Sequence, residues 1–384
     1  MRGRFVNKAL YRKYNIDTIS KKKQKKEQDR YGEIGLLSAV TLLIIVGIVM
    51  IYSASGVTTS EKYHFVFRQV FFAFIGYSFL TAILFIPIHI LQRVQYLLVG
   101  FSLVLLCLVF TPLGLKINGA SRWIHIAGFT LQPMEFAKIA LIFYCAYFIG
   151  TKQEYLQSFS KGLLPPVIIT AMMCILLIFQ PDFGSVAVFF LLLFILYFVG
   201  GGNKFYLVLI FLFGIIALTL LVIFSPYRVK RVLAFLDPFE DATNTGYQVV
   251  QSLYAVASGG LTGLGLGEGK QKLYYLPEAH NDFIFAVIAE ELGFIGVSII
   301  FSLYVFIFVR AFSISLRQQN LQNMLLTFGV TIILAMSTIF NIGVVVGLFP
   351  PKGIALPFLS YGGSNLVASC ICIGILMRFS KNIE

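Results

Sequence analysis

The chain is 384 residues long, 58% hydrophobic and only 12% charged, and its formal net charge is +13. A soluble protein of this length could not bury so much apolar surface, so the composition indicates a polytopic membrane protein. The five cysteines lie in apolar runs without CxxC spacing, which supports neither a disulfide framework nor a zinc site.

A basic tail is predicted at residues 1–33. Eleven Lys or Arg lie within residues 1–31, and the first hydrophobic run begins only near Ile34, so the segment is not a signal peptide. We expect a disordered tail that places the N-terminus in the cytoplasm under the positive-inside rule. Contact with anionic lipid head groups or with an acidic partner is the alternative. An integral membrane domain is expected to follow at 34–384.

Hydrophobic runs recur along the rest of the chain, and each approaches the roughly 20 residues of a membrane-spanning helix. The expected spans are 34–53, 66–87, 94–112, 134–150, 163–179, 184–200, 205–224, 283–309, 324–347 and 362–378. The predicted fold is an all-α polytopic membrane protein of about ten transmembrane helices. An even number of spans places both termini in the cytoplasm, and the basic character of the inner loops agrees with this.

One large extracytoplasmic loop is predicted at about 225–282, between the seventh and eighth spans. It begins with YRVKRV and carries Lys270 near its end, which indicates either an anionic ligand such as a lipid-linked phosphate or an ordinary solvated surface. Its middle, GYQVVQSLYAVASGG, has the apolar spacing of an amphipathic helix that stops at Gly259 and Gly260. The next stretch, LTGLGLGEGK, lacks the spacing of a Walker loop and predicts a hinge or close backbone packing.

Four carboxylates lie where this loop runs into an apolar helix: Glu278, Asp282, Glu290 and Glu291. Charged side chains near the bilayer centre cost roughly 2.5–3.5 kcal/mol each, so acids at such a border commonly serve a function. If 278–291 is helical, Asp282 lies in its first turn, about 80° from Glu290 around the axis, and Glu291 points the other way. Free N–H groups would stabilise a carboxylate there, so simple capping and catalysis both explain Asp282.

Polar residues also interrupt three other outward-facing segments, NGASRWIHIAGFTLQPMEFAK, QPDFG and PPKGIALPFLSYGGSN. Those of interest are Arg122, Trp123, Glu135, Lys138, Asp182, Lys352 and Ser360. Glu135 and Lys138 are three residues apart on one helix face and can form an ion pair inside the membrane. Turn chemistry explains each segment taken alone, but their common side of the membrane predicts one shared cavity.

Together, the motifs resemble those of a known family. RWI, QPMEFAK, QPDFG, LPEAHNDFIFAVIAEELGFIG and PFLSYGGSN are similar, in sequence and in order, to the motifs of the SEDS family (FtsW/RodA/SpoVE) over residues 34–380. YRVKRVLAFLDPF, YLPEAH and PPKG resemble the FtsW/SpoVE branch more than RodA. Asn281 stands where the family usually has Thr, and Met134 where it has Ser, but neither change removes a charge.

The resemblance implies a peptidoglycan glycosyltransferase that polymerises lipid II into glycan strands at the outer face of the bacterial cytoplasmic membrane, in cell division. It implies that Asp282 corresponds to an essential loop aspartate and Trp123 to a functionally important tryptophan. The implied partners are lipid II, a class B penicillin-binding protein, other division or elongation proteins and membrane lipids, but no nucleic acid. A divalent cation, Mg²⁺ or Mn²⁺, is the only cofactor considered, its ligands are unassigned, and no organic cofactor is expected.

The chemistry of sugar transfer agrees with this implication. Moving a sugar from undecaprenyl pyrophosphate to an acceptor hydroxyl with inversion needs one carboxylate base, and the pyrophosphate leaves as an anion that cations can neutralise. Asp282 is the candidate catalytic base. The candidate substrate-binding residues are Trp123, Arg122, Glu135, Lys138, Asp182, Arg228, Lys230, Arg231, Lys270, Glu278, His280 and Ser360.

Two other functions remain open. A flippase that carries lipid II outward would also have about ten spans, intramembrane charges and an outward cavity, although the sequence contains no inverted repeat of broken helices. A scaffold that recruits a synthase without chemistry of its own should tolerate the loss of Asp282.

Overall fold

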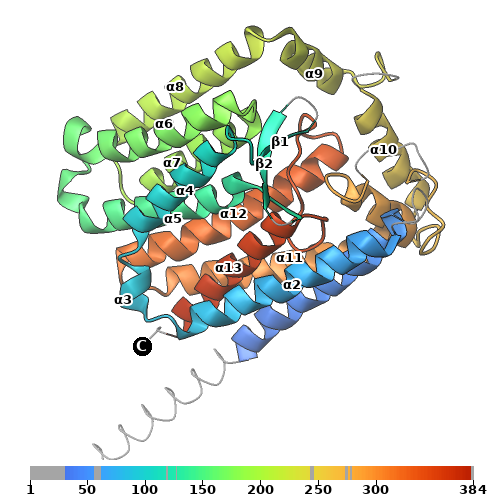
Figure 1. Ribbon diagram of the computed structural model, residues 1–384, viewed down its shortest axis with the longest axis horizontal. Coiled ribbons are helices and arrows are strands. Elements are labelled where there is room, and N and C mark those ends of the chain that lie inside the picture. The colour runs from blue at the N-terminus through green and yellow to red at the C-terminus, as the bar shows by residue number, and fades with distance from the viewer. Residues whose placement is uncertain are drawn as a thin grey trace, which may run out of the picture.

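The computed structural model describes residues 31–55, 62–117, 120–126, 128–242, 246–272, 276 and 279–381. Over these residues the chain forms a bundle of long helices with one small sheet (Figure 1). The basic tail and Glu278 lie outside the described residues, so the prediction of a disordered tail and the role proposed for Glu278 stay predictions.

A helix lies at each of the ten predicted spans. They are Tyr31–Ser55, α2 (Lys62–Phe85), α4 (Gln95–Leu108), α5 (Pro133–Thr151), α6 (Leu164–Phe179), α7 (Phe183–Val199), α8 (Lys204–Ile223), α11 (Ile284–Leu316), α12 (Leu321–Val345) and α13 (Gly363–Ser380). Over the described residues, seven helices are long and apolar enough to cross a membrane, while α4, α7 and the first part of α8 are shorter. The multi-pass class is therefore confirmed, and the count of ten spans stays a prediction.

Three helices form the centre of the bundle. The apolar stretches of α5, α12 and α13 are 78%, 72% and 83% buried, against 28% for α2 and 22% for α11. α13 packs along α2, where Gly76 faces Cys370 and Gly374 faces Leu80, so small residues let the two backbones approach closely. The outer helices expose apolar faces suited to lipid.

The all-α prediction missed a small antiparallel sheet. Its strands are β1 (Gly114–Ile117), β2 (Ala120–Ile126) and β3 (Phe129–Leu131), in the order β1-β2-β3. Ile124 of β2 is fully buried in a cluster with residues of α4. The sequence signal was an Asn-Gly dipeptide between two apolar segments, a typical hairpin pattern.

The large loop contains two further helices, α9 (Pro226–Leu236) and α10 (Tyr247–Gly259). α10 is the predicted amphipathic helix: Val249 and Val250 are buried, and Gly260 follows its end with a φ of +53°. Ser252 donates a hydrogen bond of 3.0 Å to the Val345 carbonyl of α12, so this part of the loop packs against the bundle.

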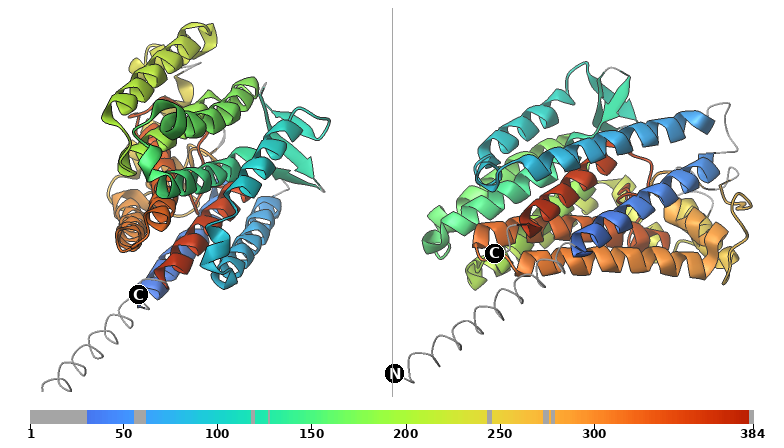
Figure 2. Two further views of the ribbon diagram at one scale, coloured as in Figure 1. Left: turned by 90° about the vertical axis from the view of Figure 1, so that its left-hand side faces the viewer. Right: turned by 90° about the horizontal axis from the view of Figure 1, so that it is seen from below.

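The two ends of the bundle differ in what they carry. The start of the first helix and the end of α13 lie at one end, together with the short helix α3 (Ile88–Leu91), whereas the sheet, α9 and α10 lie toward the other (Figures 1 and 2). A 3₁₀ turn at Gln153–Tyr155 and a π-helical turn at Phe159–Leu163 connect α5 to α6. The sheet and the helices of the large loop thus lie away from the start of the first helix and from the end of α13.

Candidate active site

Asp282 lies in a turn immediately before α11. The helix begins at Ile284, with Phe283 as its N-cap residue, so the prediction that Asp282 occupies the first helical turn was wrong by two residues. The reason is that this turn bonds to other elements: the Asp282 carbonyl accepts from Asn341 of α12, and the His280 carbonyl accepts from the Tyr361 N–H. These tertiary contacts replace the local bonds that would extend the helix.

Two loops meet at Asp282. The Asn341 side-chain amide donates 2.8 Å hydrogen bonds both to the Asp282 carbonyl and to the Ile354 carbonyl. The Asp282 carboxylate faces Gly353, because a Cβ placed on that glycine would lie 2.9 Å from Oδ2. Asn341 therefore holds the half-buried Asp282 against the segment that connects α12 to α13.

His280 and Ser360 occupy the same junction. The His280 ring lies 4.9 Å from the Phe65 ring and 5.7 Å from the Tyr361 ring, measured between centroids. Ser360 is buried, and its hydroxyl accepts a 2.8 Å hydrogen bond from the Leu356 N–H. In this structure Ser360 therefore shapes the loop, and His280 packs between α2 and that loop.

A second group of polar residues surrounds a cavity among α5, α7 and α12. Glu135 and Lys138 form an ion pair of 2.8 Å with both side chains buried, which confirms the predicted pairing. Asn365 donates a 3.3 Å hydrogen bond to Glu135 Oε2. The cavity is lined by Met134, Lys138, Ser185, Val188, Met336, Ser337, Phe340, Lys352 and Ile354.

Asp182 and Arg122 each form a hydrogen bond at the tip between α6 and α7. The buried Asp182 carboxylate caps α7, where its Oδ2 accepts a 2.6 Å hydrogen bond from the Ser185 hydroxyl. Arg122 of β2 donates to the Pro181 carbonyl and so ties the sheet to this tip. Trp123 follows on β2, partly buried and paired in register with Leu115.

Lys352 belongs to this group, although it was not among the substrate-binding residues predicted from the sequence. Its ammonium donates to the Gly184 carbonyl and lies 5.8 Å from the centroid of the Phe340 ring. Burial lowers the pKa of Lys352 to about 8, while the nearby carboxylates of Asp182 and Glu135 act in the opposite direction. Of the polar residues predicted to share one cavity, Lys138 and Lys352 line this one. Those that are not among its lining residues are Arg122, Trp123, Glu135, Asp182 and Ser360.

The basic residues of the large loop lie elsewhere. Lys230 and Arg231 are exposed on α9, which lies at the periphery between α8 and α10 (Figure 1). Lys270 is also exposed, and the side chain of Arg228 is outside what the structure describes. Lys230, Arg231 and Lys270 therefore face the surroundings of the bundle and are not among the residues that line the cavity.

Comparison with known proteins identifies the chain. The family described as "Cell cycle protein" (FtsW/RodA/SpoVE) matches residues 35–384. The chain belongs to this family. The predicted family is therefore confirmed over essentially the whole membrane domain.

Two relatives also show to which branch of the FtsW/RodA/SpoVE family the chain belongs. The probable peptidoglycan glycosyltransferase FtsW of Trichlorobacter lovleyi is 43% identical over 360 residues, which cover 92% of this chain and 94% of that protein. Stage V sporulation protein E of Bacillus subtilis is 39% identical over 352 residues, covering 90% and 96%. These values confirm the predicted FtsW/SpoVE branch.

Solved structures of the family share this fold. A chain of the structure described as "Structural coordination of polymerization and crosslinking by a peptidoglycan synthase complex" matches with a TM-score of 0.76 at 29% identity, covering 91% of this chain and 97% of that one. The rod shape determining protein RodA of Thermus thermophilus matches with a TM-score of 0.66 at 28% identity, covering 91% and 96%.

Proposed function

We propose that this FtsW-branch protein is a peptidoglycan glycosyltransferase that polymerises lipid II at the outer face of the bacterial cytoplasmic membrane during cell division. Relatives about 40% identical over nearly the whole chain carry the name peptidoglycan glycosyltransferase FtsW. The observation that carries the proposal is the Asp282 carboxylate held at a junction of two loops, next to the segment that supplies Lys352 to the cavity.

Asp282 acts as the general base in this proposal. Its carboxylate takes the proton of the attacking sugar hydroxyl, whose oxygen forms the new bond to the anomeric carbon of the donor. The bond between that carbon and the pyrophosphate oxygen breaks on the opposite face, and the pyrophosphate leaves with the electron pair. The configuration at the anomeric carbon is inverted, as in transfers that use one base and no covalent sugar–enzyme intermediate.

Cations of the cavity would neutralise the leaving group. Lys352, with a pKa lowered to about 8, is still mainly protonated at neutral pH and lies among the charges of Arg122 and Lys138. Ammonium and guanidinium groups form strong hydrogen bonds to phosphate oxygens. Arg228, Lys230, Arg231 and Lys270 are kept as candidates for a first contact with the anionic head group at the surface.

A divalent cation is compatible with these residues. Mg²⁺ is commonly bound by one or two carboxylates together with substrate phosphates, so a cation at the pyrophosphate would not need a full set of protein ligands. Over the described residues no group of three or more His, Cys, Asp or Glu side chains comes together. A bound cation would supply further neutralisation of the pyrophosphate charge.

The orientation in the membrane follows from charge. Exposed basic residues occur in the short connections at Arg93, Lys152, Lys161, Lys204 and Arg317. The positive-inside rule supports a cytoplasmic position for these connections and for both termini. The sheet, the large loop and Asp282 would then lie on the extracytoplasmic side, where a class B penicillin-binding protein could join the polymerase. The structural relative described as a peptidoglycan synthase complex supports such a partner.

Reconstitution separates this proposal from a flippase or a scaffold. The purified chain in lipid vesicles, with its cognate class B penicillin-binding protein, is supplied with labelled lipid II, and both glycan products and transbilayer movement of the label are measured. Glycan strands that require the chain support the proposal. Movement of the label without glycan products would instead identify a flippase.

A further inference from the structure

The helix α11 is broken near its start at Gly293, shortly after Glu290 and Glu291. Gly293 has φ of +61° and ψ of −168°, which is not helical and favours glycine. The break separates a short half-helix, 284–292, from the long span that follows. Asp282 immediately precedes this half-helix, so the position of the half-helix determines the position of the candidate base.

The glycine-rich loop satisfies the backbone groups that the break exposes. A helix end leaves N–H and C=O groups without helical partners, and in a membrane protein these must be bonded internally. The four bonds that do this are Leu264 N–H to Glu290 O at 3.0 Å, Gly265 N–H to Glu291 O at 3.1 Å, Phe294 N–H to Gly260 O at 2.9 Å and Ile295 N–H to Leu261 O at 3.1 Å. The loop and the half-helix therefore form one hydrogen-bonded unit.

Close backbone contact explains Gly259, at the end of α10, and Gly263 in this loop. A Cβ on Gly259 would lie 1.9 Å from the Ala289 carbonyl oxygen, and one on Gly263 would lie 2.1 Å from the Glu291 carbonyl oxygen. Of the two alternatives left open for this stretch, hinge and close packing, the described contacts fit close packing.

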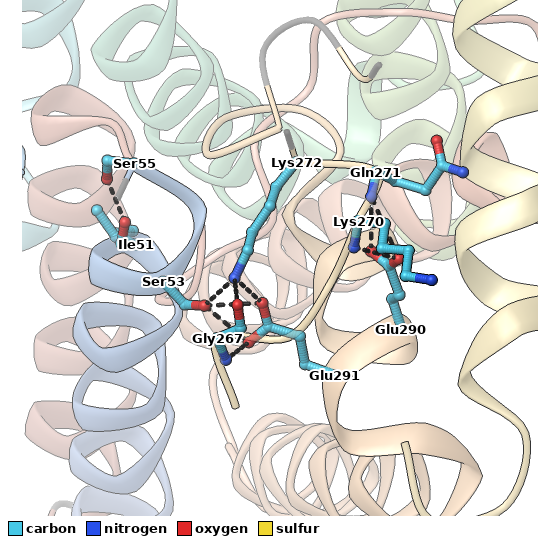
Figure 3. Close-up of polar contacts among 9 residues, drawn as sticks. All are labelled: Ile51, Ser53, Ser55, Gly267, Lys270, Gln271, Lys272, Glu290 and Glu291. Carbon is cyan, nitrogen blue, oxygen red and sulfur yellow. Dashed lines mark hydrogen bonds and ion pairs between the residues drawn. The ribbon is translucent and has the colours of Figure 1, made fainter. Parts of the chain in front are cut away.

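Glu291 connects this unit to the first helix through buried charges (Figure 3). Its carboxylate pairs with the Lys272 ammonium at 2.5 Å and accepts hydrogen bonds of 2.7 and 2.8 Å from the Ser53 hydroxyl. The Lys272 ammonium also donates to Ser53 Oγ at 2.9 Å and to the Gly267 carbonyl at 2.7 Å. Glu291 is 1% exposed and Lys272 6% exposed, so water does not screen the pair.

The carboxylate of the neighbouring Glu290 bonds, among the described residues, to backbone N–H groups of the same loop. Its carboxylate accepts from the Lys270 N–H at 2.7 Å and from the Gln271 N–H at 3.2 Å (Figure 3). The two adjacent carboxylates therefore both form hydrogen bonds to residues 267–272. Among the described contacts, Glu291 also bonds to Ser53 of the first helix. Removing one member of a buried pair leaves the other charge unpaired, which is strongly destabilising locally.

We propose that Glu291, Lys272 and Ser53 are positioning residues for Asp282. The three side chains fix the half-helix 284–292 to the first helix, and this sets where Asp282, in the turn before that half-helix, meets Gly353. The inference rests on the proposed role of Asp282 as the base. A displacement of about 1 Å at a reacting group can reduce a rate by about 100-fold.

The test is Glu291→Gln in the full chain with its partner synthase. We expect kcat for lipid II polymerisation to fall about 10- to 100-fold with KM changed less than about threefold. Amide hydrogen exchange of the peptide 264–272 should lose protection at the same time. The matched control is Glu268→Gln, which removes the same charge from an exposed position of the same loop and should change neither quantity.

A double variant keeps the test decisive if the single variant folds poorly. Lys272→Met combined with Glu291→Gln leaves no unpaired buried charge, so it should retain more activity than either single variant. Losses of activity that add up in the double variant would overturn the proposal. Faster hydrogen exchange of 264–272 with an unchanged kcat would overturn it as well. Asp282→Asn separates the two ideas, because it should abolish activity and leave the exchange of 264–272 unchanged. An active Asp282→Asn enzyme would refute the base assignment. The hydrogen exchange of 264–272 in Glu291→Gln would still test whether Glu291 holds this loop in place.

Discussion

The carboxylate of Asp282 lies directly against the backbone of Gly353, so close that a Cβ at residue 353 would be 2.9 Å from Oδ2. The two residues are 71 positions apart in the chain, since 353 minus 282 is 71. Asn341 joins their segments by donating to the carbonyls of Asp282 and Ile354. The glycine therefore leaves room for the candidate base at the junction of the two loops.

Gly353→Ala should displace the Asp282 carboxylate and lower kcat about 10- to 100-fold with little change in thermal stability, because a shift of about 1 Å is costly at a reacting group. The measurement is the initial rate of glycan formation at saturating lipid II. Gly100→Ala in α4 is the matched control, since a Cβ there meets no atom within 4 Å. Equal activity of both variants would show that the contact does not position the base.

Asn341→Leu should reduce both stability and kcat. The change removes the donor to two loop carbonyls, and each buried carbonyl left unpaired costs about 1–3 kcal/mol. Thr338→Val, one turn earlier on α12, removes a buried hydroxyl whose described hydrogen bond is to Leu334 of the same helix, and it should affect stability alone. Thermal unfolding and polymerisation rate are measured for both. A normal rate in Asn341→Leu would mean that Asp282 keeps its position without this bridge.

The loss of the Lys352 proton should make the reaction slower at alkaline pH. Its pKa is lowered to about 8, chiefly by burial, so the ammonium is present below that pH and is lost as the pH rises through it. If the charge neutralises the leaving pyrophosphate, kcat/KM, which reports the pKa values of the free enzyme, should decline above a pH of about 8 in the wild-type enzyme. Lys352→Arg, whose side chain remains charged, should remove this decline. A decline that is identical in both enzymes would assign it to another group.

The cations of α9 should act on affinity instead of on the chemical step. Neutralising Arg228, Lys230 and Arg231 together should raise KM for lipid II and leave kcat nearly unchanged, because binding lost equally from the ground and transition states changes KM alone. Expression and KM are compared with those of the wild type. An unchanged KM would support an ordinary solvated surface for α9.

Local features of the sequence predicted much of this structure. Hydrophobic runs placed the long helices because a span needs about 20 apolar residues. The Glu135–Lys138 pair followed from helical spacing, and α10 followed from its apolar pattern and the two glycines at its end. In each of these cases the interacting residues are neighbours in the sequence.

Such local patterns could not predict contacts between segments that are far apart in the sequence. The start of α11 at Ile284 depends on Asn341 and Tyr361, which bind the preceding turn from elsewhere in the chain. The place of Lys352 in the cavity depends on the carbonyl of Gly184. Neither partner is marked by spacing, so sequence alone indicated the kinds of residue at the site but not their pairing.

The most direct test of the account compares wild type with Asp282→Asn in polymerisation of labelled lipid II, with the cognate class B penicillin-binding protein and divalent metal present. Loss of a general base typically costs about 10²–10⁴-fold, so glycan ladders should form with the wild type and be absent or reduced to that extent with the variant. Both proteins must insert equally in the membrane, which their yield and thermal unfolding establish. Ladders of equal length and rate from Asp282→Asn would contradict the role of Asp282 as the base.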